Sequence, residues 1–219
     1  MDSDDYLLDD AVNTICHAID TAPCDMLFFD YIYGEGQGKP ERYIKIRDDS
    51  DPAFIDNKGE IIHQFLFGGN FNCVWMKVCS RTVVDSERDY TPFKIVANGE
   101  DVLQSLALID NSLSFLYIPK ALYYYRRDNM SMSKVYGTKD YDSFRLVNLE
   151  TLMYASKWKK SQTDLCNLKA LFLGKCMVIL HQVRNNSTKQ EYFDLMKKMG
   201  QDEYFLGLED ALNSPSTSR

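Results

Sequence analysis

The amino-acid sequence predicts an α/β fold: a mixed sheet with helices, followed by a helical C-terminal region. Two runs dense in aromatic and aliphatic residues, 24–33 and 113–125, have the composition of buried strands. Other stretches of the first part carry apolar residues at the three- and four-residue spacing of helices. Residues 139–212 carry only the helical pattern, so the strands are expected in the first part of the chain.

Three elements are expected before residue 50. Residues 5–20 predict a helix with one apolar face. Residues 24–33 predict a buried strand that ends in a glycine-containing turn. Residues 41–47 alternate in polarity, which predicts a short exposed strand as a hairpin partner of the first. The apolar face of the helix consists of Leu7, Leu8, Ala11, Val12, Ile15 and Ile19.

The middle of the chain mixes loops and helices. Residues 48–57 are polar and contain Pro52, which predicts a loop. Residues 58–67 predict a helix that two glycines close. Residues 70–84 are apolar without a regular period, and residues 100–110 again predict a helix.

The second half of the chain begins with a strand and continues as helices. Residues 113–125 predict a strand with a break at Pro119. The tail 213–219 is rich in Ser and is expected to be disordered. The four helices expected between these segments cover residues 139–159, 163–184, 188–199 and 201–212.

Charge and composition exclude several classes of protein. The 219 residues carry 25 Lys and Arg against 32 Asp and Glu, a net charge of −7, which argues against a general nucleic-acid or membrane-surface binder. No apolar run approaches the roughly 20 residues of a transmembrane helix, and the acidic start is unlike a signal peptide. We therefore expect a cytoplasmic protein whose six cysteines are reduced thiols. Peripheral attachment at the inner face of the membrane stays an alternative.

The first candidate site is the acidic segment at residues 2–5. Asp2 and Asp4 are separated by one residue, so both carboxylates can face one hard cation such as Mg²⁺ or Mn²⁺. The alternative is that these acids cap the helix expected to follow them.

The second candidate site is the acid pair Glu100-Asp101, which opens a predicted helix after Asn98-Gly99. A carboxylate there is ionised at neutral pH and could accept a proton as a general base. Helix capping is again the alternative, because acids are favoured in the first turn.

Two further sets carry groups that recognise phosphate or sugar. Arg126 and Arg127 close the strand 113–125, and arginines at a strand end can hold a phosphate by charge-assisted hydrogen bonds. The alternative is that these arginines are solvated and hold no phosphate, and that the tyrosines before them belong to the core or the sheet face. Asn72, Trp75 and Lys77 form a looser set, in which Trp75 is either core or a platform for a sugar ring.

The order of these pieces resembles the family 2 glycosyltransferases with a GT-A fold, which act in bacterial polysaccharide and cell-surface synthesis. The resemblance covers about residues 1–135 and rests on five signals. It implies the C-terminal part of a GT-A-like domain at 1–135, a helical C-terminal region at 136–212 and the tail 213–219. The signals are Asp-Ser-Asp-Asp-Tyr-Leu before a helix, the run CDMLFFDYIYG, Asn-x-x-Trp-x-Lys, Gly-Glu-Asp opening a helix, and Tyr-Tyr-Tyr-Arg with a Ser-x-Ser tail.

The resemblance implies that a sugar passes from a nucleotide-sugar donor to an acceptor hydroxyl, with inversion at the anomeric carbon. Asp2 and Asp4 match the DxD motif and would bind donor and Mg²⁺ or Mn²⁺, with Asp5 behind them. Arg126 and Arg127 would lie near the donor diphosphate. The acceptor would be a hydroxyl-bearing glycan or a lipid-linked glycan, and the oligomeric state, a homo-oligomer included, stays open.

On the acceptor side, Asp101 matches the family's base that removes the hydroxyl proton, and Glu100 would orient the acceptor. The remaining acceptor-side residues implied by the resemblance are Asn72, Trp75 and Lys77.

One departure limits the resemblance: the acidic motif begins at residue 2, whereas such enzymes place it after a nucleotide-binding half of about 90 residues, three βα units of about 30 each. We therefore expect this chain alone to be inactive, a fragment of a longer glycosyltransferase. A non-catalytic remnant or partner-binding module that keeps the acceptor-side scaffold is the alternative. A metal-dependent phosphotransferase or nucleotidyltransferase is a third.

Overall fold

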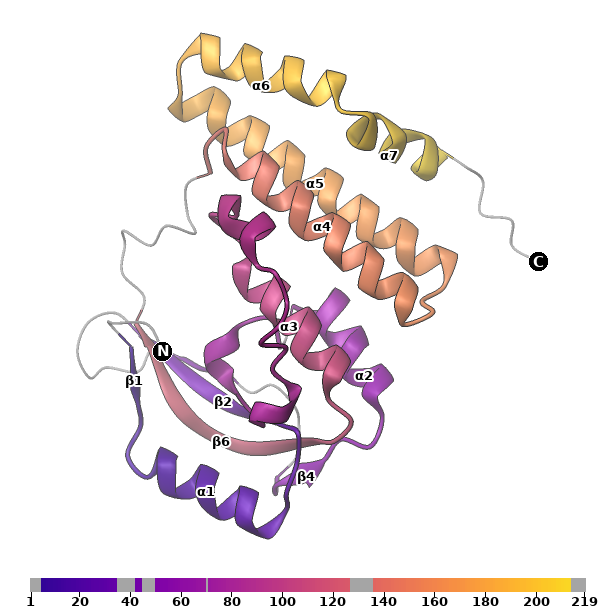
Figure 1. The fold of residues 1–219 in the computed structure, drawn as a ribbon. Helices are drawn as coiled ribbons and strands as arrows, with labels where there is room; N and C mark the ends of the chain where they lie inside the picture. The colour runs from indigo at the N-terminus through magenta and orange to yellow at the C-terminus, as the bar shows by residue number, and fades with distance from the viewer. Residues whose placement is uncertain (1–4, 35–41, 45–49, 70, 127–135, 214–219) are drawn as a thin grey trace. The chain divides into compact units, whose positions relative to one another are not determined.

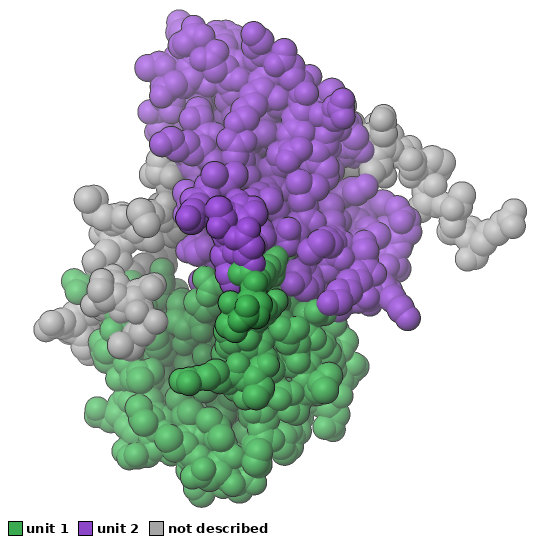
Figure 2. Space-filling view, in the orientation of Figure 1, with its two compact units in different colours: residues 1–88, 104–131 green, residues 89–103, 132–219 purple. Residues whose placement is uncertain are grey.

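The computed structural model describes residues 5–34, 42–44, 50–69, 71–126 and 136–213, without the side chains of 42–44 and 209–213. The chain divides into two compact units (Figure 2). Unit 1 comprises residues 1–88 and 104–131, and unit 2 comprises residues 89–103 and 132–219. Each unit is described by itself.

Unit 1 is built on a mixed sheet whose centre is a parallel pair, β2 (Met26–Gly34) and β6 (Phe115–Arg126) (Figure 1). The apolar run predicted to be a buried strand is β2, and its first five residues are buried. The strand predicted at 41–47 is found as β3, which pairs with β2 as expected. The four short strands, each antiparallel to its neighbour, are β1 (Tyr6–Leu7) and β4 (Ala53–Phe54) on β6, and β3 (Arg42–Ile44) and β5 (Lys77–Cys79) on β2.

The break predicted at Pro119 is an irregularity inside β6, and the strand continues beyond it. Phe29 pairs with Ile118, but the next residue, Asp30, pairs with Ala121, so Pro119 and Lys120 have no partner on β2. Proline cannot donate to the ladder, and a bulge accommodates it. The strand therefore reaches Arg126 and carries its carboxyl end beside that of β2.

The helix predicted over residues 5–20 is shorter than expected. Residues 6 and 7 form β1, and the helix α1 runs only from Ala11 to Thr21. Asp10 has a left-handed backbone, with φ 62°, and separates strand from helix. The prediction was wrong at this end because β1 pairs with β6, more than 100 residues away, and no local pattern reports such pairing. Val12, expected to face inward, is 58% exposed.

The helix predicted at 58–67 is α2 (Lys58–His63), extended by one π-helical turn at Gln64–Gly68. Gly69 ends it with φ 70°, the left-handed conformation that glycine adopts without strain. The predicted loop before α2 contains β4. The irregular stretch 70–84 holds β5 between two 3₁₀ turns, Val74–Met76 and Arg81–Val83.

The helix α3 (Glu100–Asn111) covers the predicted range 100–110 and one residue more. A short 3₁₀ helix, Thr91–Ile95, precedes it. Residues 100–103 of α3 group with unit 2, and the rest of the helix groups with unit 1. Its buried apolar residues are Leu103, Leu106, Ala107 and Ile109.

Unit 2 contains the four helices predicted from periodicity, at nearly the expected bounds. Figure 1 shows α4 and α5 running side by side, and both α6 and α7 pack on α5. Their N-terminal caps explain two of the boundaries: Ser161 and Thr188 each form a capping box with an acid three residues later. The helices are α4 (Asp140–Lys157), α5 (Gln162–Asn186), α6 (Lys189–Gln201) and α7 (Glu203–Asn213).

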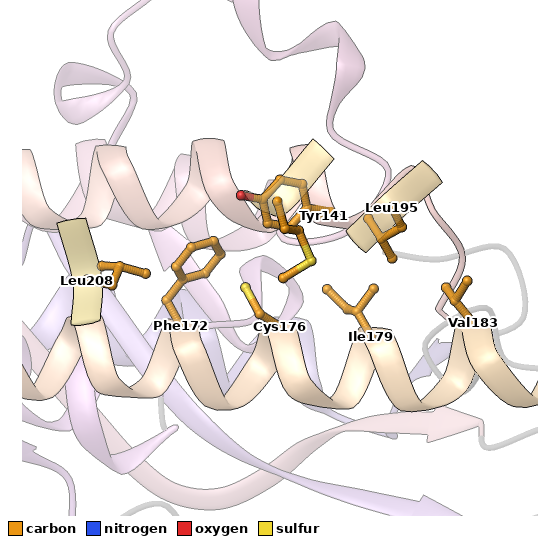
Figure 3. Close-up of a cluster of buried hydrophobic side chains, with 8 residues drawn as sticks. Tyr141, Phe172, Cys176, Ile179, Val183, Leu195 and Leu208 are labelled. Carbon is orange, nitrogen blue, oxygen red and sulfur yellow. The ribbon is translucent and has the colours of Figure 1, made fainter. Parts of the chain in front are cut away.

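The core of unit 2 lies along one face of α5 (Figure 3). Phe172, Cys176, Ile179 and Val183 follow each other at the four- and three-residue spacing of a helix, and all are buried. Tyr141 of α4, Leu195 and Met199 of α6 and Leu208 of α7 complete the cluster. Within the part of the chain that the structure describes, none of the helices is both long enough and apolar enough to cross a bilayer.

Candidate functional site

The acidic segment is anchored at the end of the parallel strand pair. Asp2 and Asp4 lie outside the described residues, but Asp5 is described and is only 7% exposed. One oxygen of its carboxylate accepts a hydrogen bond from the Tyr123 hydroxyl (2.7 Å), and the other accepts one from the backbone N–H of Arg126 (2.8 Å). Asp5 therefore ties the segment to the carboxyl end of β6, and ligand crevices of open α/β sheets lie at such ends.

Arg126 is the last residue of β6 and pairs in register with Gly34, the last residue of β2. It thus lies at the same strand end as Asp5, while Arg127 lies outside the described residues. Arg126, one of the two predicted phosphate-binding arginines, is therefore brought together with Asp5 by the hydrogen bond from its backbone N–H.

Trp75 belongs to an aromatic cluster on the sheet. Its ring is nearly parallel to those of Tyr123 (centroids 4.7 Å apart, 13°) and Tyr125 (5.4 Å, 11°), and it meets Tyr31 edge-on at 4.8 Å. Such stacked and edge-to-face pairs are favourable for aromatic rings. Trp75 as a whole residue is half-buried. Tyr123 joins this cluster to Asp5.

Lys77 and Asn72 lie in a buried hydrogen-bonded network. Lys77 is 8% exposed, and its amino group donates to the carbonyl oxygen of Phe71 and to the hydroxyl of Ser105, both at 2.6 Å. The Ser105 hydroxyl donates in turn to the carbonyl oxygen of Asn72 (2.9 Å). The side-chain oxygen of Asn72 is buried and has no hydrogen-bond partner among the described residues.

The acid pair opens α3, as predicted, and groups with unit 2. Gly99, with φ 98°, precedes it, and a Cβ built there would lie 2.9 Å from a methyl carbon of Val147. Glu100 is exposed and Asp101 is half-buried in the first turn, where the helix dipole favours carboxylates. Because the aromatic cluster and Lys77 belong to unit 1, the structure describes the two sets of predicted residues separately.

No protein-family model matches the chain, and no curated protein sequence matches it. The structure, however, resembles Staphylococcus aureus TarS 1–349 in complex with UDP, with a TM-score of 0.54 at 16% identity over 97% of this chain and 57% of that chain.

The chain shares its fold with part of TarS 1–349.

TarS 1–349 also matches in two other crystal structures, at lower TM-scores. The first has a TM-score of 0.48 and 14% identity, with 96% of this chain and 64% of that chain covered. The second, in complex with UDP-GlcNAc, has a TM-score of 0.44 and 16% identity, and the match covers 96% of this chain and 66% of that chain. The chain thus spans less than two thirds of the length of these TarS chains. The predicted fold class, a mixed sheet with helices of partial GT-A-like type, is confirmed.

Several residues of the site were missed from the sequence. Ser105 carried no signal, since only the fold brings it to Lys77. Asp30 does carry a signal in the sequence, because it is the single acid within the apolar run of β2. It is fully buried and accepts a hydrogen bond from the Tyr117 hydroxyl (2.7 Å) on β6. Among the described residues, no three His, Cys, Asp or Glu side chains gather as metal ligands would.

Proposed function

We propose that this chain is part of an inverting glycosyltransferase, which transfers a sugar from a nucleotide-sugar to the hydroxyl of a glycan or lipid-linked acceptor. The observation that carries the proposal is the fold shared with TarS, which was solved with UDP bound. The hydrogen bonds of Asp5 at the carboxyl end of β6 support it, because ligands of open α/β sheets bind at the carboxyl ends of the strands.

The donor side of the proposed site consists of Asp2, Asp4, Arg126 and Arg127. Carboxylate oxygens suit Mg²⁺ or Mn²⁺, and such an ion would neutralise charge on the departing nucleoside diphosphate. Asp5 has both carboxylate oxygens engaged within the protein, so its contribution is to hold the segment that carries the two other acids. The arginines would bind the diphosphate by charge-assisted hydrogen bonds.

The acceptor side of the proposed site consists of Asp101, Glu100, Asn72 and Trp75, and Lys77, whose amino group is buried in the hydrogen-bonded network, would support Asn72 and Trp75. Asp101 would take the proton from the attacking hydroxyl, and Glu100 would orient the acceptor. The half-buried Trp75 would offer its indole ring for contact with a sugar ring.

The experiment that tests the proposal is a transfer assay with UDP-GlcNAc and Mn²⁺ or Mg²⁺, performed on the natural protein that contains this chain. We expect transfer that depends on the cation and is abolished by Asp4→Ala. Asp9→Ala is the matched control, because Asp9 is an exposed acid five residues further along the chain, and we expect transfer to be unchanged. Equal activity of the two variants would overturn the role of Asp4, and binding of UDP-GlcNAc without any turnover would favour a non-catalytic binding module instead.

A further inference from the structure

The backbone at Phe71 is held in a conformation that its side chain disfavours. Phe71 has φ 65°, in the left-handed region that bulky residues rarely adopt. Its ring is 1% exposed and packs on Phe28 of β2, with ring centroids 4.3 Å apart. A strained residue of this kind persists only where its surroundings enforce it, and such residues gather at functional sites.

The contacts that enforce it come from Lys77 and Ser105. The Lys77 amino group donates to the Phe71 carbonyl, so the side chain of residue 77 closes a loop back onto residue 71. The same amino group bonds the Ser105 hydroxyl, which donates to the carbonyl of Asn72. Two consecutive carbonyls are thereby fixed, and buried hydrogen bonds of this kind are strengthened by the low local dielectric.

The loop closed in this way contains two of the proposed acceptor-side residues. Asn72 follows the strained residue directly, and Trp75 lies in the 3₁₀ turn that leads into Lys77. Lys77 itself is fixed by pairing with Phe28 of β2. Both ends of the 71–77 loop are therefore attached to β2. Trp75 lies within this loop, and its ring stacks on that of Tyr123.

We propose that Lys77 is a positioning residue, whose buried amino group sets the conformation of the 71–77 loop and thereby the orientation of the Trp75 ring. Through Ser105 the same group fixes the loop to α3, the helix that carries Asp101 one turn earlier. Lys77 then acts on the acceptor through Trp75 and Asn72 and makes no contact with it. The inference rests on the proposed function for the role of those two residues.

Fluorescence of Trp75 tests the proposal without any assay of activity. The chain has two tryptophans, so Trp158→Phe leaves Trp75 as the only indole. In that background, Lys77→Met removes the amino group and keeps the length of the stem. We expect a folded protein in which Trp75 emission shifts to the red and acrylamide quenches it more strongly.

Lys58→Met is the matched control. The Lys58 amino group also donates to two carbonyls, those of Asp110 (2.7 Å) and Ser112 (2.8 Å), so it loses bonds of the same kind at the end of α3. We expect a lower melting temperature and unchanged Trp75 emission. An equal emission shift in both lysine variants would show a general loss of stability and overturn the proposal.

Ser105 gives a second pair of variants in case Lys77→Met does not fold. Ser105→Ala should shift Trp75 emission in the same direction, and Ser105→Thr, which keeps the hydroxyl, should restore it. Native emission in Ser105→Ala would overturn the proposal. Transfer from UDP-GlcNAc by the unsubstituted protein is measured separately, so that a failure of the proposed function leaves the fluorescence result to decide the positioning role.

Discussion

Two buried acids of unit 1, Asp5 and Asp30, each accept a hydrogen bond from a tyrosine hydroxyl of β6. Removing such an acceptor leaves a buried hydroxyl without its partner, which is more costly than losing an exposed polar contact. Asp5 also binds the backbone N–H of Arg126, so it fixes the end of the strand as well as the side chain.

We therefore predict that Asp5→Ala lowers the free energy of unfolding by about 1–3 kcal/mol. Asp9→Ala should change it by less than about 0.5 kcal/mol, because Asp9 is exposed. Urea unfolding followed by circular dichroism measures both. Equal effects would show that the hydrogen bonds of Asp5 do not hold the segment.

Gly99 is a residue of unit 2 at which one added carbon atom should lower the stability of the folded protein. Its φ of 98° is unfavourable for any residue with a side chain, and the added carbon would lie 2.9 Å from Val147. Gly99→Ala is expected to destabilise the protein by about 1–3 kcal/mol. Gly174→Ala is the control, since a Cβ there meets no atom within 4 Å and α5 should gain helix propensity. A neutral Gly99→Ala in thermal unfolding would contradict the tight turn before α3.

At the scale of elements, capping boxes determine where α5 and α6 of unit 2 begin. The Ser161 side chain accepts from the backbone N–H of Asp164 (3.1 Å), and the Asp164 carboxylate accepts from the backbone N–H of Ser161 (3.2 Å). Ser161→Ala should destabilise the protein by about 0.5–2 kcal/mol. Ser156→Ala, an exposed position within α4, should not destabilise it, and a loss at Ser156 equal to that at Ser161 would argue against the cap.

Elements determined by local patterns were predictable, and those determined by distant partners were not. The helices of unit 2 follow from periodicity and caps within each segment. The start of α1 depends on pairing between β1 and β6, and β4 forms for the same reason inside a predicted loop. In the candidate site, the sequence indicated Lys77 as a candidate, but its contact with Ser105 depends on packing between segments 28 residues apart.

At the scale of the whole molecule, the acid sensitivity of unit 2 depends on Asp202. Its carboxylate accepts hydrogen bonds from Nε (2.5 Å) and Nη2 (3.1 Å) of Arg145 and from the Tyr141 hydroxyl (2.7 Å). Burial alone would raise the pKa of Asp202, but the hydrogen bonds from Arg145 and Tyr141 outweigh it and lower that pKa. Burial and the bond to Asp202 raise the pKa of Tyr141, which therefore remains a donor.

Because the pKa of Asp202 is lower in the folded than in the unfolded state, unfolding is coupled to uptake of a proton at acidic pH. The stabilisation from Asp202 is therefore present above about pH 4 and is lost as the pH falls through its folded pKa. Asp202→Asn should lower the melting temperature at neutral pH and weaken its fall between about pH 5 and pH 2. Asp194→Asn, at an exposed position, should retain the native pH profile, and a native profile in Asp202→Asn would contradict this account.

We propose that Asp2 and Asp4 on the donor side and Asp101 on the acceptor side perform sugar transfer. A substitution at Asp101 tests this proposal most directly. In the natural protein that contains this chain, kcat for transfer from UDP-GlcNAc and the affinity for UDP are measured side by side for Asp101→Asn. We predict that kcat falls by about 10²–10⁴-fold, because the general base is lost, while UDP binds as before. An unchanged kcat would contradict the claim.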